Sequence, residues 1–186
     1  NFLMIRRPPR STRKESSAAS DVYKRQDYID SAIENGCVAV LIEGKDFACD
    51  VPTRRIDNLK PQLYKLAQNF YTKAKDIDLI AVTGTNGKTS VSHYISQLLD
   101  FLEVDNGVIG TLGISKVDKK SVNTTPDIFS IYSSLEEYWN QGIKLAIIEA
   151  SSHALIQDRL EGLSFIQGIF TNLTQDHLDY HETMDN

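Results

Sequence analysis

A short apolar strand, a glycine-bearing turn and an amphipathic helix follow one another in the middle of this 186-residue chain. The strand covers residues 79–82, the turn contains Gly84 and Gly87, and the helix begins at Lys88. Glycine allows the backbone to curl so that several N–H groups point inward at one anion. The N-terminus of the helix presents its partial positive charge to the same place. This order of elements predicts a phosphate-binding loop.

The loop also predicts roles for its side chains. Lys88 reaches the outer phosphates of a nucleotide, and the Thr89 hydroxyl binds a magnesium ion. The most general form of such a loop has glycine six residues before the lysine, where this chain has Val82. A chance Gly-Lys-Thr in a turn is the alternative, and the strand, loop and helix in the required order argue against it. We expect the nucleotide to contact Gly84, Thr85, Asn86, Gly87, Lys88, Thr89 and Ser90.

Strands alternate with helices through the rest of the chain after residue 77. The pattern predicts strands at 79–82, 108–114, 145–148 and 165–170, and helices at 88–102, from Thr125-Pro126 to about 142, and at 153–160. Such alternation predicts an α/β fold with a doubly wound, mostly parallel sheet. Ligands of these sheets bind at the carboxyl ends of the strands. The loop, Glu149 and the segment after Phe170 all fall there.

Three segments of different character divide the chain. Residues 1–26 carry seven Lys or Arg against two Asp or Glu, and their sequence resembles translated sequencing-adapter DNA. We expect this segment to be non-native and disordered, with a nucleic-acid arm or a transit peptide as the functional alternative. Residues 27–76 contain a helix, a strand at 38–42 and a second helix at 59–73, and are interpreted as the tail of a small α/β domain. Residues 77–186 are interpreted as part of the domain that carries the loop.

Composition excludes several classes of partner. The chain has a net charge of −5, and the part after residue 26 has a net charge of −10, which argues against non-specific nucleic-acid binding. No apolar run approaches the roughly 20 residues that span a bilayer. Cys37 and Cys49 form no close metal-type pair, and free cysteines fit a reducing compartment. We therefore expect a cytoplasmic monomer without nucleic-acid or membrane partners.

Two groups of side chains at strand ends suggest metal binding. Glu149 follows the strand at 145–148, where nucleotide enzymes often hold a metal. Position alone favours a metal ligand and a solvated carboxylate equally, and the loop upstream favours the ligand. The second group has two histidines and two aspartates within six residues: Asp176, His177, Asp179 and His181. Magnesium is the preferred ion, and zinc is the weaker alternative because no cysteine lies nearby.

A third group of polar side chains begins the short helix after Glu149. Ser151, Gln157 and Arg159 suit recognition of an anionic or amide-bearing substrate. Alternatively, Ser151 or Ser152 caps the helix. Both interpretations can hold together.

Several motifs occur in one order and together resemble the Mur ligases. They are Gly-Thr-Asn-Gly-Lys-Thr from Gly84, Asn-Thr-Thr-Pro from Asn123, Glu-Ala-Ser-Ser-His-Ala-Leu from Glu149, Phe-Thr-Asn-Leu from Phe170 and Asp-His-Leu-Asp-Tyr-His from Asp176. The similarity covers about residues 27–186. The Thr-Thr-Pro and Ser-Ser-His-Ala-Leu motifs are specific to the branch that adds the third residue of the peptidoglycan stem peptide.

The resemblance implies an ATP- and Mg²⁺-dependent ligase that forms an amide through an acyl phosphate. Its substrates would be UDP-N-acetylmuramoyl-L-alanyl-D-glutamate and an amino acid, either meso-diaminopimelate, L-lysine or another amine. The resemblance makes Lys88, Glu149 and His177 catalytic, with Thr89 on a first magnesium ion and Glu149 and His177 on a second. It assigns the muramoyl-dipeptide to Thr124, Thr125, Ser151, Gln157 and Arg159, with Asn172 as a further polar contact.

The resemblance also places a carbamylated lysine, further ATP contacts and the amino-acid-binding domain beyond Asn186. We therefore expect this polypeptide to be inactive by itself and the full-length parent to be a ligase. Two alternatives stay open. A folylpolyglutamate synthase-like ligase shares the loop but is not expected to carry Ser-Ser-His-Ala-Leu. A nucleotide-switch ATPase leaves Ser151, Gln157 and Arg159 without a role.

Overall fold

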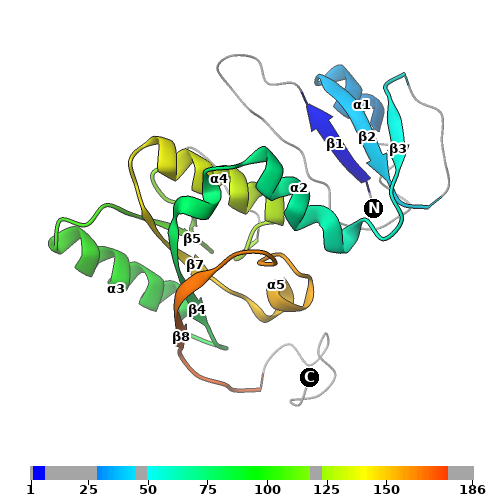
Figure 1. Ribbon diagram of the computed structural model, residues 1–186. Helices are drawn as coiled ribbons and strands as arrows, with labels where there is room; N and C mark the ends of the chain where they lie inside the picture. Colours follow the sequence, from blue (N-terminus) through cyan, green and yellow to red (C-terminus); the bar gives the residue numbers. More distant parts are fainter. Residues whose placement is uncertain (1, 7–28, 45–49, 118–122, 176–186) are drawn as a thin grey trace. The chain divides into compact units, whose positions relative to one another are not determined.

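The structure of this chain is a computed structural model that describes residues 2–6, 29–44, 50–117 and 123–175. The chain divides into two compact units, residues 1–66 and residues 67–186, and each is described by itself. Figure 1 shows the course of the chain through both units.

The first unit contains a three-stranded sheet in the order β1-β2-β3, in which β2 runs antiparallel to β1 and parallel to β3. Val40 and Ile42 of β2 pack with Ala32 and Cys37 in a small core, which confirms the expected buried strand. The elements are β1 (Phe2–Arg6), α1 (Ile29–Glu34), β2 (Cys37–Ile42), β3 (Thr53–Arg55) and η2 (Lys60–Gln62).

Strand β1 lies within the segment that composition predicts to be disordered. Its backbone pairs with β2 from Phe2 opposite Ile42 to Ile5 opposite Ala39. Disorder is therefore the wrong expectation for residues 2–6. The basic composition of the whole segment concealed a short apolar run with strand propensity. Residues 7–26 lie outside the described residues, and the origin of the segment remains a prediction.

The second unit contains a five-stranded sheet in the order β6-β5-β7-β4-β8. All neighbouring pairs are parallel except β5 with β6. This arrangement confirms the predicted mostly parallel sheet. Its strands are β4 (Asp78–Thr83), β5 (Asn106–Gly110), β6 (Gly113–Ile114), β7 (Leu145–Glu149) and β8 (Phe165–Phe170). Its helices are η3 (Ala74–Asp76), α3 (Lys88–Phe101), α4 (Ile128–Asn140) and α5 (Ser152–Ile156), and α2 (Leu63–Phe70) crosses the boundary between the units.

Helices α3 and α4 cover opposite faces of this sheet (Figure 1). On the α3 face, Val82, Val108 and Ile147 form a core cluster with apolar side chains of the helix, among them Val91, Ile95 and Leu99. On the α4 face, a Cβ atom on Gly107 would overlap the ring of Tyr138. The sheet is therefore doubly wound, with a layer of helix on each face. The carboxyl ends of its parallel strands lie between these two layers.

The ends and faces of three helices differ from the sequence prediction. Asp127, rather than Thr125-Pro126, caps α4, because its carboxylate accepts hydrogen bonds from the backbone N–H groups of Phe129 and Ser130. The predicted helix at 59–73 is shorter, with α2 beginning at Leu63 after a 3₁₀ turn that contains a proline. The predicted short helix at 153–160 is α5, which ends at Ile156.

Helical periodicity predicts that Leu98, Leu102 and Trp139 face the core, but all three side chains are at least partly exposed. Leu98 and Leu102, at the end of α3, are 64% and 66% exposed. Trp139 of α4 is half-buried, and the ammonium groups of Lys73 and Lys144 lie 4.8 Å and 4.0 Å from the centre of its ring. Tyr138 is fully buried in its place. Helical periodicity identified the apolar residues correctly but did not fix which of them turn toward the sheet.

The prediction of a single strand at 108–114 was also wrong. The chain forms β5 up to Gly110, turns at Thr111 and Leu112, and returns as β6 in antiparallel pairing. Gly113 has a φ of +106°, a conformation that glycine adopts without strain. The turn therefore places Thr111 at the carboxyl edge of the sheet.

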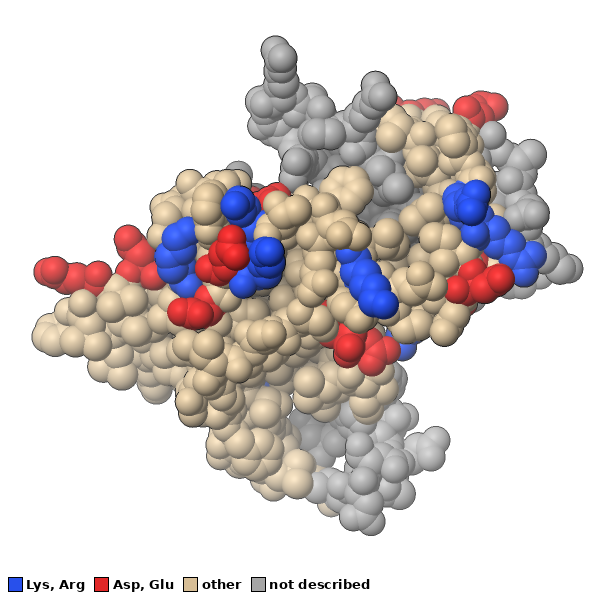
Figure 2. Space-filling view, in the orientation of Figure 1, with Lys and Arg blue, Asp and Glu red and all other residues tan. Residues whose placement is uncertain are grey.

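Of the helices in the described part of the chain, none has the length and apolar character required to cross a bilayer. On the face shown in Figure 2, positive and negative side chains are interspersed rather than gathered by sign. Among the described residues on this face, no extended basic patch of the kind that binds nucleic acids non-specifically is seen.

Candidate nucleotide and metal site

The predicted phosphate loop connects β4 to α3 at the carboxyl edge of the sheet. Gly84 has a φ of +130°, and a Cβ atom there would overlap Thr171 and approach the backbone of Asn172. Glycine is therefore required at this position. Gly87 is the N-cap of α3 and contributes no side chain to cap it. The first turn of α3 can therefore offer its N–H groups to an anion.

Lys88 lies against its own loop. Its ammonium group donates hydrogen bonds to the carbonyl oxygens of Gly84, at 2.7 Å, and Thr85, at 3.0 Å. Its side chain is half-buried. The loop thus holds a cation where the sequence predicts contact with the outer phosphates.

The segment after β8 holds the other side of the loop. We call residues Thr171–Thr174 the brace. The backbone N–H of Thr85 donates to the carbonyl oxygen of Asn172 at 2.9 Å. The Asn172 side chain accepts from the N–H of Asn86 and donates to its carbonyl oxygen. Thr171 and Thr174 add hydrogen bonds to Asn86 and Thr85. Asn172, a predicted polar contact of the site, therefore fixes the loop backbone.

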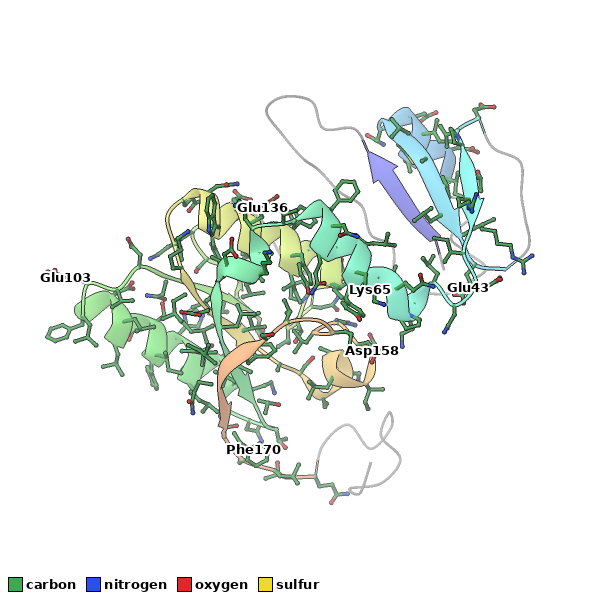
Figure 3. The ribbon with its side chains drawn as sticks, in the orientation of Figure 1. Glu43, Lys65, Glu103, Glu136, Asp158 and Phe170 are labelled. Atoms are coloured by element: carbon green, nitrogen blue, oxygen red, sulfur yellow. The ribbon has the colours of Figure 1, made fainter. Side chains whose placement is uncertain are left out.

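Phe170, at the end of β8, leads the chain directly into the brace (Figure 3). The loop follows β4 and the brace follows β8, and these two strands are paired as neighbours in the sheet. The sheet therefore sets the distance between loop and brace.

Glu149 ends β7 on the α3 face of the sheet and is completely buried. Its Oε2 atom accepts hydrogen bonds from the hydroxyls of Thr89, at 2.8 Å, and Thr111, at 2.9 Å. Its Oε1 atom accepts from the backbone N–H of Thr111 at 3.2 Å. Ser92 adds a long contact at 3.5 Å. Gly110 gives the carboxylate its space, because a Cβ atom there would overlap Oε1.

The donor set around Glu149 fits a magnesium ion. A carboxylate and the Thr89 hydroxyl are adjacent oxygen ligands of the kind that Mg²⁺ prefers. Among the described residues, Glu149 forms no ion pair with Lys, Arg or His, so its buried negative charge is balanced by neutral donors alone. A buried carboxylate in such a setting favours an added cation.

His177, the other predicted metal ligand, lies outside the described residues, as do Asp176, Asp179 and His181. Within the described part of the chain, no three His, Cys, Asp or Glu side chains gather as a metal cluster. The contribution of His177 therefore remains a prediction.

Thr124 and Thr125, predicted to contact the substrate, have different partners: Thr124 lies beside Thr111, and Thr125 contacts the backbone of Glu149. Thr124 is half-buried, and its hydroxyl is 3.2 Å from that of Thr111. Thr125 is fully buried. The Thr125 hydroxyl donates to the carbonyl oxygen of Glu149 at 2.6 Å and accepts from the N–H of Ser151 at 3.0 Å. The structure thus places Thr125 between β7 and the start of α5. Its hydroxyl is occupied by hydrogen bonds to the backbone of both elements.

Ser151, Gln157 and Arg159 also meet at this edge. The Ser151 hydroxyl accepts from the N–H of Ala154 and caps α5, which confirms the alternative interpretation of this serine. The guanidinium of Arg159 donates to the carbonyl oxygen of Thr125 at 2.6 Å and to the side-chain oxygen of Gln157. These predicted substrate residues form one hydrogen-bonded group around Thr125.

The structure therefore gathers the loop, Glu149 and the predicted substrate residues along one edge of the sheet. Ser90, the last residue of the predicted nucleotide contacts, lies exposed in the first turn of α3. Sequence reasoning missed Thr111, because it assigned residues 108–114 to an uninterrupted strand. The Gly-Thr-Leu-Gly sequence at 110–113 was the available signal for a turn at a strand end.

Comparisons with known proteins agree with this arrangement. Residues 82–186 match the family of the Mur ligase middle domain. The chain is 39% identical over 169 residues to UDP-N-acetylmuramoyl-L-alanyl-D-glutamate--2,6-diaminopimelate ligase 2 of Clostridium acetobutylicum, covering 86% of this chain and 35% of that protein. It is 40% identical over 162 residues to the corresponding ligase of Bacillus licheniformis, covering 86% of this chain and 33% of that protein.

A solved structure of a UDP-N-acetylmuramoyl-L-alanyl-D-glutamate--2,6-diaminopimelate ligase superposes with a TM-score of 0.71 at 32% identity. The superposition covers 87% of this chain and 33% of that chain. This chain thus spans about a third of the length of the relatives that it matches.

Proposed function

Because the chain belongs to the Mur ligase family, we propose that it supplies the ATP-binding part of a ligase that extends UDP-N-acetylmuramoyl-L-alanyl-D-glutamate by a third amino acid. The observation that carries this proposal is the buried Glu149 carboxylate, 2.8 Å from the hydroxyl of Thr89 and directly beside the phosphate loop. A folylpolyglutamate synthase-like ligase and a nucleotide switch have less support, because the relatives that match are named as diaminopimelate ligases.

In this proposal the residues of the loop bind ATP. The N–H groups at the start of α3 and the ammonium group of Lys88 receive the phosphates. Lys88 then exchanges the carbonyl oxygens of Gly84 and Thr85 for phosphate oxygens. Thr89 would hold one Mg²⁺, and Glu149 together with His177 would hold a second. When bound, Mg²⁺ neutralises charge on the transferred phosphoryl group.

The reaction needs the substrate carboxylate held in line with the ATP terminal phosphate, and an amine held near the acyl carbon. An oxygen of the substrate carboxylate bonds to the terminal phosphorus, and the bond between that phosphorus and ADP breaks. The amine then bonds to the acyl carbon, phosphate leaves with the C–O electrons, and the amine loses a proton. Thr124, Ser151, Gln157 and Arg159 would orient the muramoyl-dipeptide for these steps, with Thr125 supporting them.

The names of the relatives support diaminopimelate as the added amino acid. The same proposal places the protein in the cytoplasm, where its nucleotide substrates would be made. Because this chain spans about a third of its relatives, activity is proposed for the full-length protein.

Nucleotide binding to the 186-residue chain tests the proposal most directly. We expect calorimetry to show MgATP binding that Lys88→Ala weakens at least ten-fold, because the phosphates lose their cation. The matched control is Lys75→Ala, an exposed lysine of the same unit, which should bind as the unmodified chain does. Unchanged binding by the Lys88 variant would contradict the proposal.

The substrate is tested in the full-length parent. Phosphate release from ATP should require both the UDP-muramoyl-dipeptide and diaminopimelate. Turnover with a folate and glutamate instead would favour the folylpolyglutamate alternative, and ATP hydrolysis without either substrate would favour a nucleotide switch.

A further inference from the structure

Among the described residues, Thr111 makes the most hydrogen bonds to the buried carboxylate, and the motifs gave it no role. It is the first residue after β5, in the turn that leads to β6. Its backbone N–H donates to Oε1 of Glu149 at 3.2 Å, and its hydroxyl donates to Oε2 at 2.9 Å. One residue thus holds both oxygens of the carboxylate.

These two hydrogen bonds fix the rotation of the Glu149 carboxyl group. With each oxygen held from the same side, the carboxylate plane cannot turn without breaking one of the bonds. Gly110 completes the fit, because any side chain there would displace Oε1. The orientation keeps Oε2 next to the Thr89 hydroxyl, where the proposed magnesium site lies.

The Thr111 hydroxyl also joins two other hydroxyls. It lies 3.3 Å from Oγ1 of Thr89 and 3.2 Å from Oγ1 of Thr124. A hydroxyl has one proton to donate and two lone pairs that accept. The single proton of the Thr111 hydroxyl is donated in the hydrogen bond to Glu149. The lone pairs of the Thr111 oxygen can therefore still accept a hydrogen bond from Thr124. Thr111 thereby links the carboxylate to a residue predicted to contact the substrate.

We propose that Thr111 is a positioning residue that orients the Glu149 carboxylate beside Thr89 and so determines how strongly Mg²⁺ supports nucleotide binding. This inference rests on the proposed function, since it takes Thr89 and Glu149 to be the metal ligands. Thr111 acts through Glu149 and needs no contact with the nucleotide.

The proposal makes a different prediction from a purely structural role in the turn. Loss of a turn residue lowers folding stability and weakens all binding to the loop alike. Loss of a positioning residue weakens binding of the magnesium complex and leaves binding of metal-free ATP unchanged. The ratio of the two affinities therefore separates the roles.

The experiment compares Thr111→Val with Thr111→Ser in the 186-residue chain. Valine keeps the shape and removes the hydroxyl, and serine restores the hydroxyl. Calorimetry measures ATP affinity with excess Mg²⁺ and again with EDTA, and thermal melting follows folding. Thr72→Val, at an exposed threonine of the same unit, is the matched control.

We expect Thr111→Val to weaken MgATP binding about ten-fold and binding in EDTA by less than two-fold, since a charge-assisted hydrogen bond is lost at the carboxylate. Thr111→Ser should stay within about three-fold of the unmodified chain, and Thr72→Val should match it. Equal losses in both conditions, or no loss for the valine variant, would overturn the proposal.

The outcome for the unmodified chain is read first. If Mg²⁺ does not strengthen its ATP binding, the proposed metal site fails and with it the premise of this inference. If Mg²⁺ strengthens binding equally in the unmodified chain and in Thr111→Val, the metal site stands and the role of Thr111 fails. If valine prevents folding, Thr111→Ala, with a side chain smaller than that of valine, replaces it under the same criteria.

Discussion

At the scale of single residues, Tyr138 is one of three buried tyrosines among the described residues of the second unit, with Tyr71 and Tyr132. Tyr138 of α4 is completely buried, and its ring occupies the space that Gly107 leaves free. Its hydroxyl donates to the carbonyl oxygen of Ser115 at 2.8 Å, and the carbonyl oxygen of Val108 lies 3.2 Å from the same hydroxyl. Tyr138 therefore joins α4 to β5 and to the segment after β6.

Burial raises the pKa of Tyr138 to about 12, with a smaller opposing effect from the hydrogen bond to Ser115. A raised pKa means that the folded state keeps its proton when the unfolded state loses it. The contribution of Tyr138 to stability is thus complete below about pH 10 and declines from there toward pH 12, by roughly 2–3 kcal/mol in all.

Tyr138→Phe should therefore change how stability depends on pH. Near pH 8 it should lower the free energy of unfolding by about 1 kcal/mol, because the hydrogen bond that the hydroxyl donates to main-chain carbonyl oxygen is lost. Between pH 10 and 12 its stability should fall less steeply than that of the unmodified chain. Urea unfolding across this range measures both effects, with Tyr94→Phe on the exposed face of α3 as the control. Parallel curves for Tyr138→Phe and the unmodified chain would contradict the assignment.

At the scale of elements, the phosphate loop takes its shape from the brace as well as from its own glycines. Two loop N–H groups are satisfied by Asn172 in different ways. The N–H of Thr85 donates to the backbone carbonyl of Asn172, and the N–H of Asn86 donates to its side chain. A substitution of Asn172 removes only the second of these bonds.

Asn172→Ala should therefore loosen the loop selectively. We expect the Asn86 amide to exchange with solvent about ten-fold faster and the Thr85 amide to change little, because its acceptor is main chain. Amide hydrogen exchange followed by NMR measures both positions in one sample. The neighbouring substitution Gln175→Ala should leave both unchanged, and equal acceleration at both amides would show that the whole brace has detached.

The elements also show what the sequence could and could not predict. The order of strands and helices was predictable because each strand of the parallel sheet is a short apolar run and each helix has an apolar period. The break at Thr111 was missed although Gly110 and Gly113 signal a turn, because the residues on both sides continue the apolar run. The burial of Tyr138 in place of Trp139 was equally hidden, since adjacent aromatic residues fit either face of a helix.

The candidate site also had a part that the sequence predicted and a part that it did not. The loop and Glu149 were predictable because both lie at strand ends, where a parallel sheet gathers its ligands. The supporting contacts of Thr111, Thr125 and Asn172 depend on hydrogen bonds between segments far apart in the chain. No local pattern encodes such contacts.

At the scale of the whole molecule, all described site residues belong to the second compact unit, from Gly84 in the loop to Asn172 in the brace. The first unit has its own sheet and its own small core around Val40 and Ile42. Figure 3 shows Glu103 after the end of α3 and Glu43 after β2, each within a different unit. A ligand that binds only the second unit should therefore stabilise the chain unevenly.

MgATP should protect residues 67–186 from hydrogen exchange and leave residues 1–66 unchanged. A ligand at a concentration one hundred times its dissociation constant stabilises the state that binds it by about 2.7 kcal/mol. Protection should be greatest in β4, β7 and the first turn of α3, because these elements hold the loop and Glu149. Lys88→Ala should reduce the protection at the same ligand concentration, to about 1.4 kcal/mol or less, because its affinity falls at least ten-fold. Equal protection of both units would mean that they unfold together, and protection limited to the first unit would place the nucleotide elsewhere.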